Sequence, residues 1–244
     1  GKSVVIEEFL TGIEVSYFVL TDGCSYVLLP EAKDYKRIGD GDTGPNTGGM
    51  GAVSPVPFCD SVFTNKVTER IIKPTIEGLQ AEKIEYKGFI FIGLMNVAGE
   101  PYVIEYNCRM GDPETEVVLP RIKNDLVDLF IATSEGNLHN KNIDSFEKTA
   151  ITVVVASKGY PADYSKGDAI EGLECITEST VYHAGTKIEN GIIKSNGGRV
   201  FAVTSIGNSI DDAREKSYRT IENIRWQSKY YRTDIGNDLK KYVL

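Results

Sequence analysis

Apolar runs in the first half of the chain predict a sheet built from hairpins. Residues 4–10 are mostly apolar and begin with three β-branched residues, and they predict a buried strand. Residues 15–20 alternate in the way of a second strand, and residues 26–29 predict its hairpin partner. Residues 88–97 are apolar almost throughout, which is typical of a strand buried on both faces. After a short turn, residues 102–107 predict the strand that follows.

Three further segments are predicted to be helices. Residues 63–80 repeat apolar side chains every three or four positions, and Pro74 is expected to kink this helix. A second helix is predicted to begin at Asp112, with Pro113 at its first position. A third is predicted over residues 126–133.

The second half of the chain has shorter elements. A polar stretch over residues 134–148 precedes strands that we predict over residues 151–156, 167–170, 181–186 and 200–204. Ser209 is expected to cap a closing helix. We therefore predict two domains. Residues 1–148 form a mostly antiparallel sheet with helices, and residues 149–244 form a small β-rich domain with that closing helix.

Composition restricts the function classes. The 244 residues carry a net charge of −8, with 41% hydrophobic residues, so the chain is globular and a poor candidate for binding nucleic acid. Its sequence has no apolar run near the roughly 20 residues of a membrane span, which predicts no membrane association. Four scattered cysteines favour a reduced, cytoplasmic protein, and two histidines exclude a His-rich metal site.

Glu105 and Asn107 form the most informative pair in the sequence. They lie two apart on a predicted strand, so both side chains leave the same face, while Ile104 faces the other way. A carboxylate and an amide oxygen on one face can hold Mg²⁺, which takes few protein ligands and keeps its waters and substrate phosphates. The alternative is the solvated face of an edge strand.

Arg109 and Asp112 follow directly. Arg109 offers a fork for phosphate or carboxylate, and the amides near Gly111 could cradle an anion. The alternative for Asp112 is an ordinary helix cap. Cys108 is interpreted as a small buried neighbour, because no histidine that could activate it is near in sequence.

A long irregular segment over residues 31–57 contains a glycine-rich loop at residues 39–51. Its G-x-G-x-x-G pattern is not a dinucleotide fingerprint, because no helix can follow directly. We interpret it as a flexible loop that wraps an anionic substrate with backbone amides. The alternative is a disordered surface loop.

Three motifs together resemble a known family. They are residues 7–14 (Glu-Glu-Phe-Leu-x-Gly-x-Glu), residues 42–51 (Asp-Thr-Gly-Pro-Asn-Thr-Gly-Gly-Met-Gly) and residues 104–115 (Ile-Glu-Tyr-Asn-Cys-Arg-Met-Gly-Asp-Pro-Glu-Thr). They closely resemble phosphoribosylamine–glycine ligase, an ATP-grasp enzyme of purine biosynthesis. Later segments, including residues 196–200, look like its C-terminal domain. The resemblance covers essentially the whole chain and implies an ATP-grasp large lobe of the α+β class.

The resemblance implies a reaction. Glycine is activated by ATP to a glycyl phosphate, and the amine of 5-phosphoribosylamine attacks it to give glycinamide ribonucleotide, ADP and phosphate. The implied cofactors are ATP and Mg²⁺ or Mn²⁺. Full-length members also have an amino-terminal region that binds phosphoribosylamine and completes the nucleotide site. The sequence contains no counterpart of this region ahead of Gly1. The chain therefore resembles the carboxy-terminal part of the enzyme, and we expect it to be incomplete alone.

The resemblance also implies roles for individual residues. The adenine-contacting hinge would be Glu7, Glu8, Phe9 and Leu10, with Glu14 at the ribose. Glu105 and Asn107 would bind the metal. The residues facing the reacting phosphate and the substrates would be Arg109, Asp112, Asp42 and Asn46. Residues 89–96 lack the additional metal carboxylate of many ATP-grasp relatives. The alternatives are another ATP-grasp carboxylate–amine ligase and a non-catalytic nucleotide-binding domain.

Overall fold

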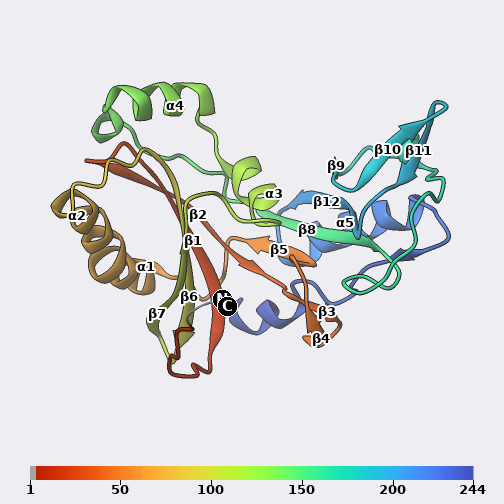
Figure 1. The fold of residues 1–244 in the computed structure, drawn as a ribbon, viewed down its shortest axis with the longest axis horizontal. Coiled ribbons are helices and arrows are strands. Elements are labelled where there is room, and N and C mark those ends of the chain that lie inside the picture. The colour runs from red at the N-terminus through yellow and green to blue at the C-terminus, as the bar shows by residue number, and fades with distance from the viewer. Residues whose placement is uncertain (1–3, 244) are drawn as a thin grey trace.

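The computed structural model describes residues 4–243, and its centre is one antiparallel sheet (Figure 1). The strand order is β7-β6-β1-β2-β5-β8-β12-β9, with β13 paired to β8. In chain order these strands are β1 (Ile13–Thr21), β2 (Tyr26–Asp34), β5 (Gly51–Ser54), β6 (Gly88–Val97), β7 (Glu100–Asn107), β8 (Thr149–Ser157), β9 (Thr180–His183), β12 (Arg199–Gly207) and β13 (Lys229–Tyr230). Every pair is antiparallel, as predicted.

Within residues 4–243, five α-helices accompany the sheet. They are α1 (Ser61–Val67), α2 (Lys73–Ala81), α3 (Thr115–Val118), α4 (Leu126–Glu135) and α5 (Ile210–Asn223). A π-helical turn at Thr68–Ile72 joins α1 to α2 and ends just before Pro74, near the start of α2. The irregularity predicted for this helix is therefore a π turn, which suits a proline that cannot donate a hydrogen bond to the preceding turn. No helix within residues 4–243 is both long and apolar enough to cross a membrane.

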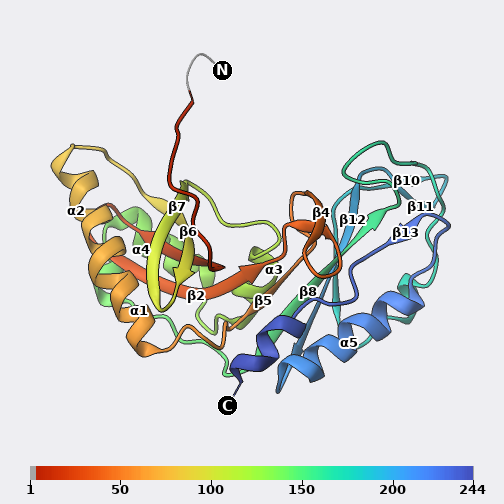
Figure 2. The same cartoon turned by 90° about the horizontal axis from the view of Figure 1, so that it is seen from below.

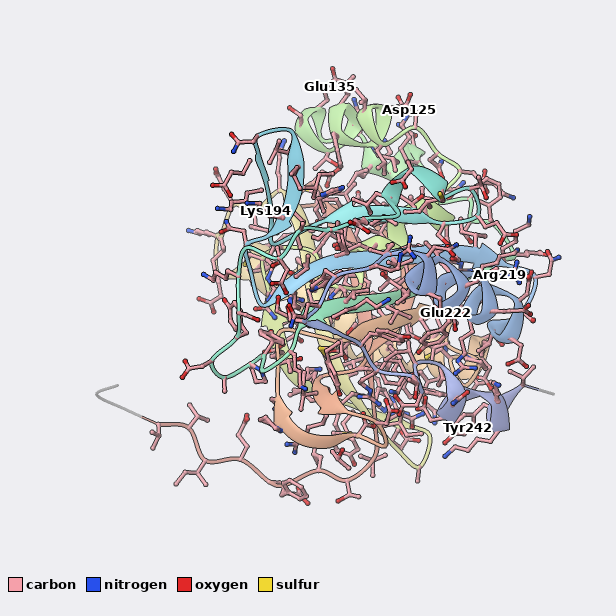
Figure 3. The ribbon with its side chains drawn as sticks, turned by 90° about the vertical axis from the view of Figure 1, so that its right-hand side faces the viewer. Asp125, Glu135, Lys194, Arg219, Glu222 and Tyr242 are labelled. Carbon is pink, nitrogen blue, oxygen red and sulfur yellow. The ribbon has the colours of Figure 1, made fainter. Side chains whose placement is uncertain are left out.

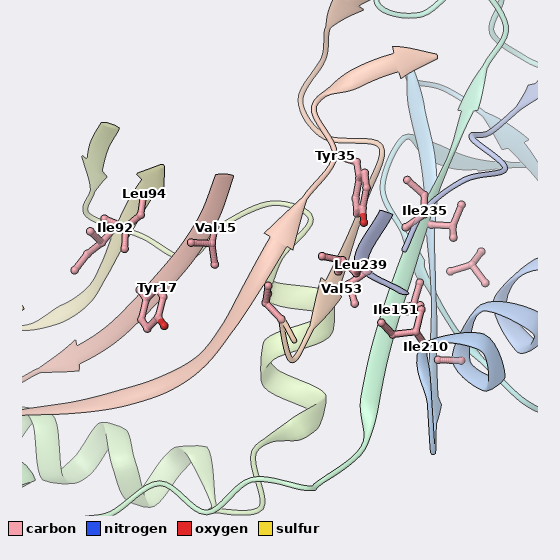
Figure 4. Close-up of a cluster of buried hydrophobic side chains, with 14 of the residues drawn as sticks. Val15, Tyr17, Tyr35, Val53, Ile92, Leu94, Ile151, Ile210, Ile235 and Leu239 are labelled. Carbon is pink, nitrogen blue, oxygen red and sulfur yellow. The ribbon is translucent and has the colours of Figure 1, made fainter. Parts of the chain in front are cut away.

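Two hydrophobic cores lie on opposite faces of the sheet, and β1 contributes to both by strict alternation. Val15, Tyr17 and Val19 pack with α1, α2, β8, β12 and α5 in the larger core (Figure 4). Phe18 and Leu20 point to the other face and pack with residues of α3 and α4. This two-residue period confirms the prediction for β1 and fixes which of its side chains can reach the α3 side.

The prediction of a buried strand over residues 4–10 is wrong. This segment has no strand partner and projects from the body (Figure 2), where Val5 is 84% exposed and Phe9 is 92% exposed. Its composition favours a strand, but pairing is a non-local event that composition does not report.

Residues 31–57 are more ordered than the sequence indicated. The strand β2 continues to Asp34, β3 (Arg37–Gly39) and β4 (Thr43–Asn46) form a small hairpin, and β5 bridges β2 to β8. The hairpin stands above the sheet near the middle of the molecule (Figure 2). Glycines hid these strands from a reading based on apolar periodicity, because their backbones pair without apolar side chains.

Three smaller predictions are also corrected. The helix expected from Asp112 begins at Thr115 and ends at Val118. Residues 167–170 make an isolated bridge through Ala169 instead of a strand. The strand expected over residues 181–186 ends at His183, and β10 (Thr186–Glu189) then pairs with β11 (Ile192–Ser195) across the predicted Asn190–Gly191 turn.

The α5 side of the molecule is packed closely with the rest. Helix α5, which carries Arg219 and Glu222 (Figure 3), lies against β8 and β12. Ser209 caps its start, and the Ser209 hydroxyl accepts a hydrogen bond from the Asp212 amide at 3.1 Å. The sheet and the larger core contain residues from both sides of residue 148, since β5 pairs with β8. A domain boundary near residue 148 stays a prediction.

Candidate active site

A continuous cleft follows the end of the sheet where β1, β6 and β7 approach the β3–β4 hairpin. It consists of adjoining cavities of about 320, 360, 330 and 230 Å³. Glu14 lines three of these cavities, and Lys36 lines three. The three motifs that the sequence singled out therefore border one space, although they are separated by up to a hundred residues in the chain.

The predicted hinge lines one end of the cleft. Glu7, Glu8, Phe9 and Leu10 border the cavity of about 360 Å³ together with Glu14. Its opposite wall comes from β7 and consists of Tyr102, Val103 and Ile104. A mostly apolar slot with a few carboxylates suits a planar heterocycle better than a phosphate.

Lys36 occupies the centre of the cleft. Its ammonium group pairs with Glu14 and lies 2.9 Å from a carboxylate oxygen of Asp34. Burial favours the neutral amine, but Asp34 and Glu14 outweigh this effect and raise the pKa of Lys36 above its ordinary value. Lys36 is therefore a fixed cation at neutral pH, and it sits where an anionic ligand would meet it.

The register of β6 and β7 places Glu105 over the floor of the cleft. Ser16, Gly93 and Glu105 lie side by side across β1, β6 and β7. A Cβ atom added to Gly93 would lie 3.1 Å from Cγ of Glu105, so the glycine leaves room for this side chain. Glu105 lines two of the cavities.

Asn107 is two residues further along and pairs with Phe91. The two positions therefore share a face of β7, as the sequence predicted. A bulge between Glu105 and Val103 disturbs the alternation, and Ile104 lines the same cavity as Glu105 instead of facing away. The amide nitrogen of Asn107 is buried and has no hydrogen-bond partner among the described residues.

Arg109 and Glu114 line the cavity of about 330 Å³ beside Glu105. The guanidinium carbon of Arg109 lies 5.6 Å from the ring centre of Phe91. Glu114 is only 3% exposed and accepts a hydrogen bond from the Ser16 hydroxyl at 3.1 Å. Burial is the main cause that raises the pKa of Glu114 to about 7, and the nearby Asp34 adds to it.

Asp112 is neither a helix cap nor a free carboxylate. Its two oxygens each accept a hydrogen bond from Arg199 at 2.7 Å, a bidentate pair with the first residue of β12. It lines the same cavity as Arg109 and Glu114.

Asp42 and Asn46 border the cavity of about 320 Å³ on the hairpin side. Asp42 accepts a hydrogen bond from Arg232 at 2.7 Å, and Arg232 also bonds to Asp234. Asp234 in turn accepts a hydrogen bond from the amide of Gly41 at 2.8 Å. The hairpin is thus attached to the carboxy-terminal segment, in contrast to the flexible loop that the sequence suggested.

Several residues of the cleft were not singled out as site residues from the sequence. These residues are Lys36, Glu114, Arg199 and Arg232. Glu114 lies within the third motif and Arg199 within residues 196–200, so the resemblance covers both without giving either a role. Cys108 is exposed, so the interpretation of it as a buried neighbour is wrong. Among the described residues, no group of three His, Cys, Asp or Glu side chains forms a metal site.

This fold and cleft define an ATP-grasp protein of the α+β class, a class that uses ATP with a divalent metal ion. The same architecture occurs in the L-amino acid ligase from Bacillus licheniformis, with a TM-score of 0.60 and 16% identity over 91% of this chain and 55% of that one. That identity is low enough that the likeness concerns the fold alone.

The chain belongs to the phosphoribosylglycinamide synthetase family. The family's ATP-grasp (A) domain matches residues 1–115, and its C domain matches residues 150–238. The phosphoribosylamine–glycine ligase of Caldanaerobacter subterraneus is 45% identical over 97% of this chain and 57% of the relative. The crystal structure of the Thermotoga maritima ligase of that name gives a TM-score of 0.85 and 37% identity over 93% of this chain.

The chain spans about 56% of the length of that solved structure and 57% of the Caldanaerobacter relative. The order of the two matched domains agrees with the predicted resemblance to the carboxy-terminal part of the ligase.

Proposed function

We propose that this chain supplies the ATP-grasp and C domains of a ligase that joins glycine to 5-phosphoribosylamine with ATP. The products are glycinamide ribonucleotide, ADP and phosphate. The observation that carries the proposal is the convergence of the hinge, the glycine-rich hairpin and the β7 motif on one cleft. The partner it requires is the amino-terminal region that relatives have in addition, and a cytoplasmic location stays a prediction.

The reaction divides into two displacements. In the first, a carboxylate oxygen of glycine attacks the γ-phosphorus of ATP, and ADP leaves. In the second, the amine nitrogen of phosphoribosylamine attacks the carbonyl carbon, phosphate leaves, and the nitrogen loses a proton. Neither displacement needs a nucleophile from the protein. Both need positioned reactants and compensation of negative charge, which is what a cleft with fixed cations provides.

The residues of the cleft divide these tasks. In the proposal, residues 7–10 hold the adenine in their slot, and Glu14 meets the ribose. Lys36 and Arg109 supply fixed positive charge to the transferring phosphate, since both line the cavity that Glu105 also borders. Asp42 and Asn46 face the substrates from the hairpin side.

Glu105 and Asn107 offer the kind of ligand atoms, side-chain oxygens, that a divalent metal such as Mg²⁺ prefers. Both offer an oxygen ligand on one face of β7, and the amide nitrogen of Asn107 has no partner among the described residues that would compete for the side chain's orientation. Two protein ligands match the preference of Mg²⁺ for phosphate and water oxygens, and Mn²⁺ accepts the same ligands. The bound ion would supply charge neutralisation on the phosphates.

The test replaces Glu105 by glutamine in a full-length ligase that contains this chain. Loss of the carboxylate removes a metal ligand without changing side-chain volume, so ADP release that depends on glycine and phosphoribosylamine should fall at least about a hundredfold, or ~2.7 kcal/mol of barrier.

The matched control is Glu100→Gln on the same strand. Glu100 pairs with Lys66 and Arg70 outside the cleft, so this variant should turn over like the wild type. Turnover of Glu105→Gln within about tenfold of Glu100→Gln would contradict the metal assignment. A wild-type protein that binds nucleotide without ligating glycine would instead favour a non-catalytic domain.

A further inference from the structure

Arg199 belongs to the carboxy-terminal half of the chain, yet its side chain reaches two loops of the ATP-grasp half. One guanidinium nitrogen donates to the Gly48 carbonyl at 2.6 Å and to one Asp112 oxygen at 2.7 Å. The other donates to the second Asp112 oxygen at 2.7 Å. One planar group therefore joins segments that lie 87 and 151 residues away in sequence.

These two segments are opposite walls of one cavity. Thr47 and Gly48 line it on one side, and Gly111 and Asp112 line it on the other. The walls touch at Gly49, where an added Cβ atom would lie 2.3 Å from Cδ of Pro113. Arg199 bonds both walls directly beside this contact, so it fastens the rim of the cavity that also contains Arg109 and Glu114.

The base of Arg199 is itself held firmly. Its backbone carbonyl accepts a hydrogen bond from the Gly185 amide at 2.9 Å, and its position in β12 pairs with Ala156 of β8. Tyr160 adds a second link from the same half of the molecule. Its hydroxyl oxygen accepts a hydrogen bond from the Gly48 amide at 3.0 Å, so Gly48 is held at both its N–H and its C=O group.

We propose that Arg199 is a positioning residue of the ligase site, which acts through Asp112 and Gly48 to keep the rim of this cavity in its substrate-receiving shape. The proposal rests on the proposed function. It also reassigns Asp112, whose charge is matched by Arg199, from a group facing the reacting phosphate to an anchor. A guanidinium can satisfy two carboxylate oxygens and a carbonyl in one plane, and an ammonium group cannot.

An ordinary surface ion pair would give a different result on removal. Exposed pairs contribute little to stability, and a pair that positions no part of the site would leave turnover unchanged when it is removed. A positioning pair lets the loops separate, and small misplacements in an active site are costly. Removing Arg199 should therefore lower turnover if the pair positions the loops, and should leave turnover unchanged if it is an ordinary surface ion pair. Both interpretations predict a melting temperature close to that of the wild type.

The experiment uses Arg199→Lys and Arg199→Met in a full-length ligase that contains this chain. We expect kcat/KM for glycine to fall about 10- to 100-fold in both variants, with the melting temperature close to that of the wild type. Arg219→Lys is the matched control, because Arg219 also bridges two carboxylates, Glu178 and Glu215, but does so on α5 outside the cleft. It should behave as the wild type.

A double-mutant cycle with Asp112→Asn tests the route. If Arg199 acts through Asp112, the double variant should lose no more activity than the worse single variant. Wild-type kinetics in both Arg199 variants would overturn the proposal. So would losses that multiply in the double variant, because Arg199 would then act by a route separate from Asp112.

Amide hydrogen exchange on the 244-residue chain separates this inference from the proposed function. The amides of Gly48 and Gly49 should exchange faster in Arg199→Met than in the wild type, whether or not the protein ligates glycine. A ligase that is inactive as wild type would end the proposed function and leave this measurement to decide the anchoring. Equal exchange in the two proteins would overturn the anchoring itself.

Discussion

Replacing the buried carboxyl group of Glu114 by an amide should stabilise the protein at neutral pH. Glu114 is 3% exposed, and among the residues that the structure describes one side chain donates to it, the Ser16 hydroxyl at 3.1 Å. The charged groups that face it are Asp34 and Lys36 from the β2 side, with Glu105, Arg109 and Asp112 lining the same cavity. Burial and Asp34 oppose its ionisation more than its own backbone amide, the Ser16 hydroxyl and Lys36 together favour it.

The magnitude follows from the two states of the carboxyl group. In the folded protein its pKa rises from an ordinary 4.5 to about 7. The folded state therefore binds this proton more tightly than the unfolded state, and stability falls as the pH rises between these values. Above pH 7 the cost approaches ~3 kcal/mol, and below pH 4.5 it vanishes because both states are protonated. Glu114→Gln should remove this cost while its amide oxygen still accepts the Ser16 hydrogen bond.

The assay is urea unfolding of the wild type and of Glu114→Gln from pH 4 to 8, without nucleotide or metal. The difference in the free energy of unfolding should grow from near zero at pH 4 to ~3 kcal/mol in favour of the variant at pH 8. Glu85→Gln is the control. Glu85 is exposed, so this variant loses one negative charge, as Glu114→Gln does, but the charge that it loses is not buried. A Glu114→Gln difference that stays constant with pH would refute the reasoning.

Two other substitutions test the attachment of the hairpin and of the cavity rim. Arg232 is 1% exposed and bonds to Asp42 and Asp234, so Arg232→Met should lower the free energy of unfolding by about 3 kcal/mol; a loss no larger than that of the exposed Arg225→Met would contradict it. Gly49 has a φ of +107° and contacts Pro113, so Gly49→Ala should reduce ligase kcat/KM in the full-length enzyme by at least about tenfold. Wild-type kinetics in that variant would show that the rim tolerates displacement.

The sequence predicted the sheet well where local pattern and tertiary pairing agree. Alternation along β1 is visible because its two faces enter two apolar cores, one with Val15 and one with Phe18. The same logic failed at residues 4–10, whose apolar side chains have no strand to pack against in the described chain. It also failed at β3 and β4, because glycine-rich strands carry no apolar period.

The site was predictable where its residues are neighbours in sequence. Glu105 and Asn107 share a face because strand geometry dictates it, and Arg109 follows them by adjacency. The bulge at Ile104 was not predictable, since nothing local signals which residue of a strand will be left unpaired. The pairing of Asp112 with Arg199 and of Asp42 with Arg232 was also hidden, because 87 and 190 residues separate the partners.

These long-range pairs give the carboxy-terminal half a part in the cleft. Arg199 holds the rim, Tyr160 holds Gly48, and Arg232 holds the hairpin that carries Asp42. Arg199, Tyr160 and Arg232 all follow residue 148, near which we predict the domain boundary. These three contacts are hydrogen bonds, and each meets a loop or hairpin that borders a cavity. The half that lacks the hinge and β7 motifs therefore shapes the space in which those motifs meet.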